Sequence, residues 1–294
     1  MSQGPDVQAS EFDARRGRLV GLAYRMLGSW AEAEDVVQDA FLRFRAVDLG
    51  QVREPSSYLS TTVARLCLDR LKAARTQREA YVGTWLPEPI VDEAAVAPDR
   101  PLELADDLSF ALLMTLERLS PPERTAFLLH DVFGVAFEQI AQVLERSEPA
   151  CRKLAERARA QVHEGRPRFQ PDPEQEARLL QAFMLASATG DIAALTELLA
   201  QDVVLYTDGG GKRLAALNPI CGRDRVSRFL VSLPRKSNYH APSRVELRPV
   251  NQMLGCLLHY PDGDLAAAAF EMRAGVITRI YVVSNPDKLR HLKR

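Results

Sequence analysis

The sequence predicts a multidomain protein in which two all-helical domains precede an α+β domain. Up to about residue 165, apolar residues recur at three- and four-residue steps, which is the spacing of amphipathic helices. Proline-rich stretches at 81–101 and 166–174 interrupt this pattern and are predicted linkers. After the second linker, helical patterns give way to strand-like runs, the order typical of an α+β domain. The three predicted domains span residues 10–80, 102–165 and 175–294.

The composition allows about two or three domains with apolar cores. The chain has 294 residues, of which 46% are hydrophobic, and a net charge of −1. The molecule as a whole is therefore not a polycation, and any contact with nucleic acid must come from local basic patches. Such patches occur at residues 65–78 and 146–168.

The cysteines and histidines show no spacing typical of a metal site, so we expect neither a bound metal nor a cofactor. Three of the four cysteines lie in apolar helix or strand patterns, as buried reduced thiols of a cytosolic protein do. No apolar run approaches the ~20 residues of a membrane span, and the polar N-terminus does not resemble a secretory signal. We therefore expect a cytoplasmic protein without membrane contact. The cysteines are Cys67, Cys151, Cys221 and Cys256.

The stretch FEQIAQVLERSEPACRKLAERAR, residues 137–159, predicts two short helices joined by a tight turn. Phe137, Ile140 and Leu144 share one face of the first helix, and Ser147 can cap the second. The second helix buries small and apolar residues and presents a polar, mostly basic outer face. This pattern is typical of a helix-turn-helix that enters the DNA major groove. A helical hairpin with a solvated basic face explains the same residues about equally well.

In the first helical domain, Ser29 and Glu32 form a predicted capping box that opens a helix ending near Ala46. Acidic residues crowd its first turns, among them Asp35 and Asp39. The simpler explanation is that acidic side chains favour the positive end of a helix dipole. The alternative is an acidic contact surface for a basic partner.

A further helix is predicted after Pro55. Its outer face repeats polar and basic residues at three- and four-residue steps, which suits phosphates and partly melted bases. A solvated helix end explains the basic residues as well, because cations are favoured near a helix C-terminus. The residues of this face are Arg65, Asp69, Lys72 and Arg75 or Thr76, and Arg70 and Arg78 add charge nearby.

The first linker carries apolar residues that a fully solvated linker would lack, namely Tyr81, Trp85, Leu86 and Ile90. A tryptophan has little reason to stay in water, so we expect Trp85 to dock on a domain surface.

The last domain is predicted to begin with a helix at 173–189 and a short helix ending near Leu199. A strand at 203–206, a glycine-rich turn at 208–212 and a helix at 224–233 follow. Strand-like runs then complete the domain, and we expect them to pair antiparallel. These runs span residues 244–250, 253–260, 265–272 and 276–283.

Taken together, these segments resemble an extracytoplasmic-function sigma factor of bacterial RNA polymerase. Residues 31–46 resemble the polymerase-binding helix of region 2, and residues 55–79 resemble the helix that opens and reads the minus-ten promoter element. Residues 120–159 resemble region 4, whose helix-turn-helix reads the minus-35 element. Three short motifs, WLPEP, DGGGK and NPDKL, resemble the signatures of a subgroup with a fused C-terminal SnoaL-like domain. The motif residues are Trp85, Leu86, Pro87, Glu88, Pro89, Asp208, Gly209, Gly210, Gly211, Lys212, Asn285, Pro286, Asp287, Lys288 and Leu289.

The resemblance implies a transcription initiation factor that binds core RNA polymerase and promoter DNA and carries out no covalent chemistry. The implied polymerase-binding residues are Asp35, Gln38, Asp39 and Phe41. The implied minus-ten contacts are Arg65, Asp69, Arg70, Lys72, Arg75 and Arg78. The implied minus-35 contacts are Ser147, Glu148, Arg152, Lys153, Glu156 and Arg157.

The same resemblance implies that the C-terminal domain regulates the two DNA-binding regions of its own chain. Trp85, Leu86 and Pro87 would anchor it, and the other two motifs would contribute. A tethered partner acts at high effective concentration, so even a weak contact can restrain the regions. Each of these two motifs also has a purely structural explanation that fits equally well. DGGGK can be a loop that needs the backbone freedom of glycine, and NPDKL can be a C-terminal turn.

SnoaL-like domains often enclose a pocket, and the candidates to line it are Tyr206, Asp208, His240, His259 and Tyr281. There are three alternatives for that pocket. Its own side chains fill it, it binds an unidentified small signalling ligand, or it catalyses a reaction. Catalysis lacks an Asp–His pair at a defined spacing that would supply a general acid and base. Two rival functions remain: a ligand-sensing DNA-binding regulator that does not join polymerase, and an enzyme with a helical partner domain.

Overall fold

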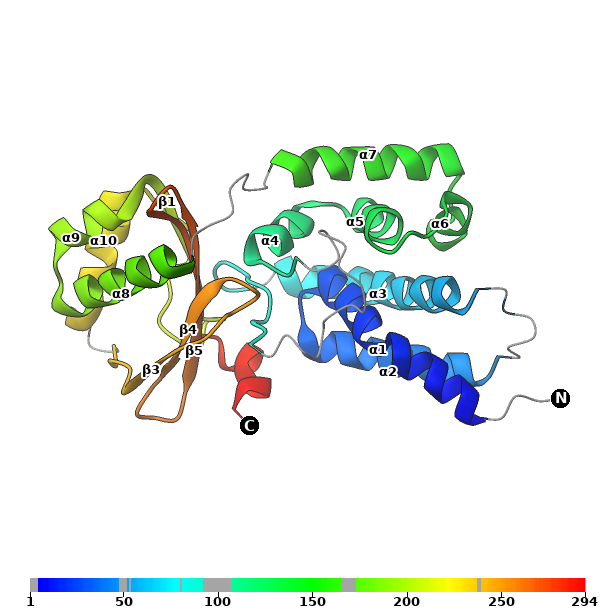
Figure 1. Ribbon diagram of the computed structural model, residues 1–294, viewed down its shortest axis with the longest axis horizontal. Helices are drawn as coiled ribbons and strands as arrows, with labels where there is room; N and C mark the ends of the chain where they lie inside the picture. Colours follow the sequence, from blue (N-terminus) through cyan, green and yellow to red (C-terminus); the bar gives the residue numbers. More distant parts are fainter. Residues whose placement is uncertain are drawn as a thin grey trace. The chain divides into compact units, whose positions relative to one another are not determined.

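The computed structural model describes residues 5–47, 52, 54–79, 81–91, 107–164, 173–236 and 239–293. The chain divides into two compact units (Figure 1). The first comprises Met1–Glu79 and Asp92–Arg166, and the second comprises Ala80–Val91 and Pro167–Arg294. The first part of the predicted linker thus belongs to the C-terminal unit. None of the described helices is long and apolar enough to span a bilayer.

The described part of the first unit is helical throughout. Ser29 caps the second helix, because its hydroxyl accepts the Glu32 N–H at 3.2 Å. Ser120 and Glu123 form a capping box at the start of a later helix. The elements are α1 (Pro5–Leu27), α2 (Trp30–Arg45), α3 (Pro55–Glu79), α4 (Phe110–Arg118), α5 (Pro121–Phe127), the π-helical turn η3 (Leu128–Val132), α6 (Phe137–Leu144) and α7 (Glu148–Glu164).

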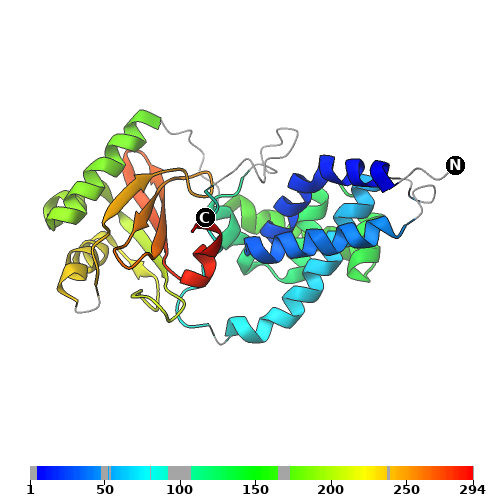
Figure 2. The ribbon, with the colours of Figure 1, turned by 90° about the horizontal axis from the view of Figure 1, so that it is seen from below.

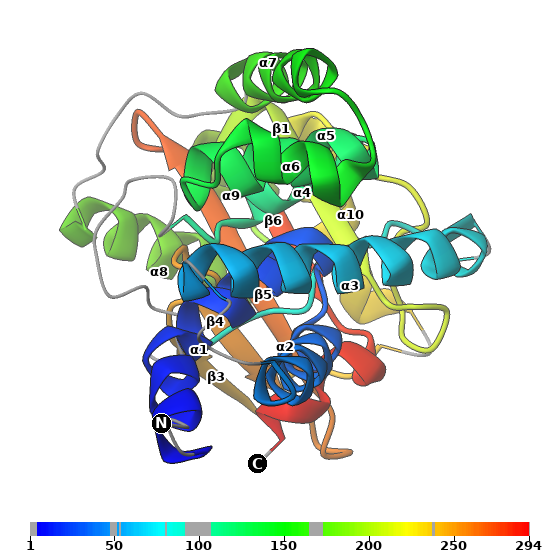
Figure 3. The same ribbon diagram turned by 90° about the vertical axis from the view of Figure 1, so that its right-hand side faces the viewer.

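Helices α6 and α7 form the predicted helix-turn-helix. Glu145 adopts a left-handed backbone, with φ of 53°, and ends α6. Helix α7 buries Cys151, Ala155 and Ala158, and Arg159 ties it to Asp131 of η3 at 2.7 Å. Within this unit, α5 and α6 lie between α7 and α3, and α3 packs in turn on α1 and α2 (Figures 1 and 3).

The second unit is an α+β domain built on a six-stranded sheet of order β2-β1-β6-β5-β4-β3. The four strand-like runs at the end of the chain pair antiparallel as expected, whereas β1, which was not among them, pairs with β6 in parallel. These two strands lie at opposite ends of the domain sequence, so no turn signal announces their pairing. The elements are α8 (Pro173–Thr189), α9 (Ile192–Leu198), β1 (Leu199–Asp208), β2 (Ile220–Cys221), α10 (Arg223–Ser232), η4 (Leu233–Arg235), β3 (Arg244–Leu247), β4 (Leu254–His259), β5 (Leu265–Arg273), β6 (Val276–Val283) and the 3₁₀ helix η5 (Pro286–Leu292).

The two faces of this sheet have different partners. Side chains alternate along a strand, so Leu205, Phe270 and Ile280 share one face and pack with the helices in the apolar core. Tyr206 and Asp208 lie on the opposite face. In Figures 1 and 2, η5 lies on the other side of the sheet from α8. The C-terminal motif is therefore placed beside the face that carries Asp208.

Candidate functional site

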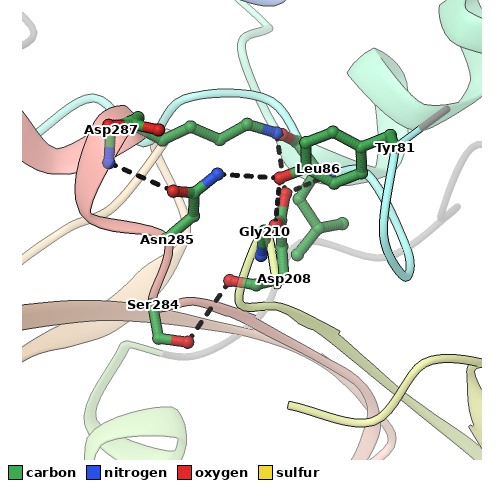
Figure 4. A network of polar contacts seen from close by, with 8 residues as sticks. Tyr81, Leu86, Asp208, Gly210, Ser284, Asn285 and Asp287 are labelled. Carbon is green, nitrogen blue, oxygen red and sulfur yellow. Dashed lines mark hydrogen bonds and ion pairs between the residues drawn. The ribbon is translucent and has the colours of Figure 1, made fainter. Parts of the chain in front are cut away.

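Both oxygens of the Asp208 carboxylate are occupied by donors, and the side chain is fully buried. Oδ1 accepts hydrogen bonds from the Tyr81 hydroxyl at 2.5 Å and from the Gly210 N–H at 3.1 Å. Oδ2 accepts from the Leu86 N–H at 2.9 Å and from the Lys288 ammonium at 2.7 Å. A buried carboxylate needs such partners, because burying an unpaired charge is costly. Two of these four donors belong to the linker, so linker docking and compensation of the charge are coupled (Figure 4).

Lys288 brings the C-terminal motif to the same point. Its side chain is 9% exposed, and its ammonium donates to the Leu86 carbonyl at 2.5 Å as well as to Asp208. The ammonium also lies 4.2 Å from the ring centroid of Trp85 and 4.9 Å from that of Tyr81. Both rings stabilise the cation through their negative faces. The linker therefore supplies three of the groups that compensate this buried positive charge.

Asn285 completes the arrangement by donating from Nδ2 to the Tyr81 hydroxyl at 2.9 Å, while its own N–H donates to the Asp208 carbonyl at 3.0 Å. Burial, and then the hydrogen bond to the Asp208 carboxylate, raise the pKa of Tyr81, so the hydroxyl stays protonated and able to donate. We call this group the linker clasp; it consists of Tyr81, Leu86, Asp208, Asn285 and Lys288.

The glycines of the DGGGK turn allow the clasp to close. Gly210 has φ of 57°, and a Cβ added there would lie 2.2 Å from Nδ2 of Asn285. A Cβ at Gly209 would lie 2.3 Å from the Arg213 carbonyl oxygen. The DGGGK turn thus needs glycine both for its backbone conformation and for its close approach to neighbouring groups. The explanation as a glycine-rich loop and the explanation as a regulatory contact therefore describe the same contact.

We expect Gly210→Ala to loosen the clasp. The left-handed backbone alone costs an alanine about 1–2 kcal/mol, and displacement of Asn285 adds to that cost. The matched control is Gly263→Ala, where φ is 81° but no heavy atom lies within 4 Å of the added Cβ. Urea unfolding and limited proteolysis of the linker should show a larger effect at residue 210 than at residue 263. Equal losses from the two variants would contradict a close contact with Asn285.

The remaining motif residues surround the clasp. Pro87, Pro89 and Leu289 are buried, whereas Trp85, Glu88 and Pro286 are half-buried. At the surface, Lys212 pairs with Asp287 at 2.5 Å, and its hydrogen bond holds the pKa of that carboxyl below its usual range. The three motifs are therefore brought together on the face of the sheet that is opposite the helices. Gly211 lies at the exposed end of the same turn.

The predicted polymerase-binding residues lie on α2. Asp35, Gln38 and Asp39 are exposed, whereas Phe41 is half-buried against α1. Arg70, predicted from the sequence to contact DNA, reaches this surface from α3, 3.7 Å from Asp35 and 3.4 Å from Asp39. Arg70 is thus paired with the acidic residues of α2.

The other predicted minus-ten residues follow the outer face of α3. Arg65, Asp69 and Lys72 are exposed, and the last two form an ion pair of 3.6 Å. The side chains of Arg75 and Arg78 lie outside the described residues. The described members therefore form one polar stripe, as the helical spacing predicts.

The predicted minus-35 residues lie at the start of α7 and along its outer face. Ser147 is exposed and Glu148 is half-buried. Arg152 pairs with Glu148 at 3.2 Å and lies 4.6 Å over the ring of Phe137, so it is partly engaged within the helix-turn-helix. The further exposed members are Lys153, Glu156 and Arg157.

Within the first unit, the two predicted DNA-binding domains contact each other. Arg18 of α1 donates to the Phe133 carbonyl at 3.2 Å and lies 5.0 Å over its ring. Arg65 of α3 donates to the Gln142 carbonyl of α6 at 3.4 Å. A predicted minus-ten residue is thus hydrogen-bonded to the helix-turn-helix.

The candidate pocket residues of the second unit do not converge. Tyr206 and Tyr281 stack, with ring centroids 5.4 Å apart, on the face that carries Asp208. His240 is exposed, and His259 lies 3.2 Å from a glutamate of β3. The helix-covered face is packed with apolar side chains. Among the described residues, no group of three or more His, Cys, Asp or Glu side chains could hold a metal ion.

Sequence reasoning missed Tyr81 as a member of the site. The available signal was an aromatic residue at the start of a proline-rich linker, but its partner Asp208 is 127 positions away. No periodicity connects residues at such a separation.

Comparison with known proteins identifies the two helical regions of the chain and relatives that match along its length. The Sigma-70 region 2 family matches residues 12–77, and the Sigma-70 region 4 family matches residues 109–162. The chain is 38% identical over 291 residues to the ECF RNA polymerase sigma factor SigJ of Mycobacterium tuberculosis (strain ATCC 25618 / H37Rv), covering 96% of this chain and 93% of that protein. It is 33% identical to the probable ECF RNA polymerase sigma factor SigI of Mycobacterium tuberculosis (strain CDC 1551 / Oshkosh), covering 100% of this chain and 98% of that one.

The structural comparison extends the match through the C-terminal unit. The crystal structure of the Mycobacterium tuberculosis extracytoplasmic function sigma factor SigJ matches with a TM-score of 0.74 at 35% identity, over 96% of this chain and 98% of that chain. The helical regions and the mixed-sheet domain are thus both shared. The chain therefore belongs to the extracytoplasmic-function sigma factors of bacterial RNA polymerase, in the subgroup with a fused C-terminal SnoaL-like domain.

Proposed function

We propose that this sigma factor directs core RNA polymerase to promoters by binding alone, and that its C-terminal unit restrains it through the linker clasp. The observation that carries the regulatory part is the buried pair of Asp208 and Lys288, whose compensation depends on Tyr81, Trp85 and Leu86 of the linker. The linker joins region 2 to region 4. Holding it therefore acts on both DNA-binding regions.

The exposed acidic residues of α2, Asp35 and Asp39, and the neighbouring Gln38 are the proposed contacts to core polymerase. The stripe of Arg65, Asp69 and Lys72 is proposed to contact the melted minus-ten element. The outer face of α7 is proposed to enter the major groove at the minus-35 element, where arginine to guanine is the commonest specific contact.

The packing of the first unit supports a resting state. The minus-ten and minus-35 elements lie about 25 base pairs apart, which is roughly 85 Å along the DNA at ~3.4 Å per base pair. Helix α6 packs between α3 and α7, so only about 20 Å separates the axes of α3 and α7 at ~10 Å per packed pair. Regions 2 and 4 must therefore move apart to bind both elements together.

The clasp limits how far they can move. Fully extended, residues 80–107 span at most roughly 90 Å at ~3.3 Å per residue. When residues 81–91 are held on the C-terminal unit, the distance between their two ends is fixed, so they cannot extend to separate regions 2 and 4. The remaining residues 92–107 span at most roughly 50 Å.

Run-off transcription with core polymerase tests this function. Leu86 is fully buried beside Asp208, so Leu86→Asp places a second carboxylate there and should release the linker. The matched control is Val82→Asp in the same linker, because Val82 is 53% exposed. We expect more RNA from Leu86→Asp than from the wild type or the control. Ending the chain after Ser284 removes Asn285 and Lys288 and should act in the same direction.

Two outcomes would contradict the proposal separately. A folded full-length protein that neither binds core polymerase nor yields RNA would exclude the sigma-factor activity. Equal or reduced RNA from Leu86→Asp, with normal yield from the wild type, would exclude restraint by the clasp.

A further inference from the structure

A second set of contacts holds the linker at its other end, at Pro89 and Ile90, through two residues that lie outside all three motifs. Ile90 is 4% exposed, and both of its main-chain polar groups are bonded to Asn251. The Ile90 N–H donates to Oδ1 of Asn251 at 2.9 Å, and the Asn251 N–H donates to the Ile90 carbonyl at 2.8 Å. One residue thus satisfies both main-chain polar groups of Ile90, as a neighbouring strand would.

The turn that contains Asn251 fixes the position of this residue. It lies in the turn between β3 and β4, is fully buried, and has φ of 51°, a left-handed conformation that asparagine tolerates better than most residues. The turn is closed by the bridge between Val250 and Met253. Val250 packs so closely on Gly255 that a Cβ there would lie 2.9 Å from its Cγ2. The acceptor therefore points at Ile90 from a pre-organised turn.

His291 of η5 forms a hydrogen bond with the carbonyl group of Pro89, the residue before Ile90. Its Nε2 lies 2.8 Å from the carbonyl oxygen of Pro89. A carbonyl oxygen can only accept, so this nitrogen must carry the hydrogen. Three successive main-chain groups, from the Pro89 carbonyl to the Ile90 carbonyl, are thus captured by two side chains and one N–H.

We propose that Asn251 and His291 form a second clamp, which holds the linker through its main chain and sets the point where it leaves the C-terminal unit toward region 4. This inference rests on the proposed restraint by the linker. The linker clasp contacts the Tyr81 side chain as well as the main chain of Leu86, whereas the second clamp contacts only main-chain groups. Its release lengthens the free segment while the clasp stays closed.

The test uses full-length Asn251→Gly. Glycine keeps the backbone N–H and adopts the left-handed conformation easily, so the acceptor for Ile90 is lost while the main-chain bond to the Ile90 carbonyl is kept. Ala274→Gly is the matched control, because Ala274 has φ of 48° in the turn between β5 and β6. His291→Leu removes the donor to Pro89.

Amide-resolved hydrogen exchange reports on the two anchors separately. We expect the Ile90 amide to exchange about ten-fold faster in Asn251→Gly, as befits loss of one buried hydrogen bond, while the Leu86 amide on Asp208 is unchanged. Unchanged exchange at Ile90, or equal acceleration at Leu86 and Ile90, would overturn the second clamp.

Transcription then separates this inference from the function it rests on. Increased run-off RNA from Asn251→Gly, below that from Leu86→Asp, supports both. Faster exchange at Ile90 with wild-type RNA from both variants would overturn the restraint while leaving the clamp established.

Discussion

Replacing Asp208 with asparagine should destabilise the C-terminal unit by about 3–5 kcal/mol, the usual cost of removing one partner of a buried ion pair. Lys288 would then be a buried cation without its counter-charge. An amide at this position also supplies one acceptor oxygen, where the carboxylate now accepts four hydrogen bonds. Urea unfolding of the full-length protein should show an earlier transition for the C-terminal unit, and the linker should become sensitive to protease.

The double variant D208N with K288M distinguishes charge from packing. Methionine fills much of the space of the lysine stem without a charge, so it should recover part of the lost stability. The linker should nevertheless stay loosened, because Leu86 would lose the ammonium on its carbonyl. If the double variant were as unstable as the sum of the two single variants, the buried pair would not be the source of the effect.

Replacing Arg124 with methionine should have a comparable effect on the first unit, about 3–5 kcal/mol. Arg124 of α5 is 2% exposed and donates to the Met26 carbonyl in the last turn of α1 and to the Glu117 carboxylate of α4 at 2.8 Å. One guanidinium thus satisfies a terminal carbonyl of a region 2 helix and a carboxylate of region 4. Its removal leaves both without that donor.

We also expect Arg124→Met to uncouple the two regions. Thermal unfolding of the wild-type first unit should be one transition, and the variant should show two, with regions 2 and 4 melting separately. The control is Arg118→Met, because Arg118 is exposed on α4 and such substitutions usually change stability by less than about 0.5 kcal/mol. Wild-type stability in Arg124→Met would exclude this residue as the link between the regions.

Local signals predicted most of the elements. The helix at 173–189 and the strand at 276–283 were predicted with the bounds that the structure has. Ser29, Ser120 and the turn at Glu145 mark helix ends through interactions within a few residues. Such signals are legible because hydrogen bonding in a helix and at its caps spans only three or four positions.

Pairings between distant residues were not predicted. The parallel contact of β1 with β6 joins strands separated by the rest of the domain, and β2 is only two residues long. Arg70 was a minus-ten candidate only through the family resemblance, and its ion pairs with Asp35 and Asp39 were not predicted. A long side chain at the border between two helical faces can reach either one, and only the neighbouring helix decides which.

The sequence by itself determined the family, the two helical DNA-binding regions and the three motifs of the C-terminal part, because these depend on short patterns and their order. Tertiary structure alone decided what the motifs do to one another. Asp208, Lys288 and Tyr81 come from three separate segments, and their charges and hydroxyl are compensated only when all three meet in a buried place. Asn251 and His291 carry no motif at all, because main-chain groups of the linker can be recognised by any polar side chain that the fold aims at them.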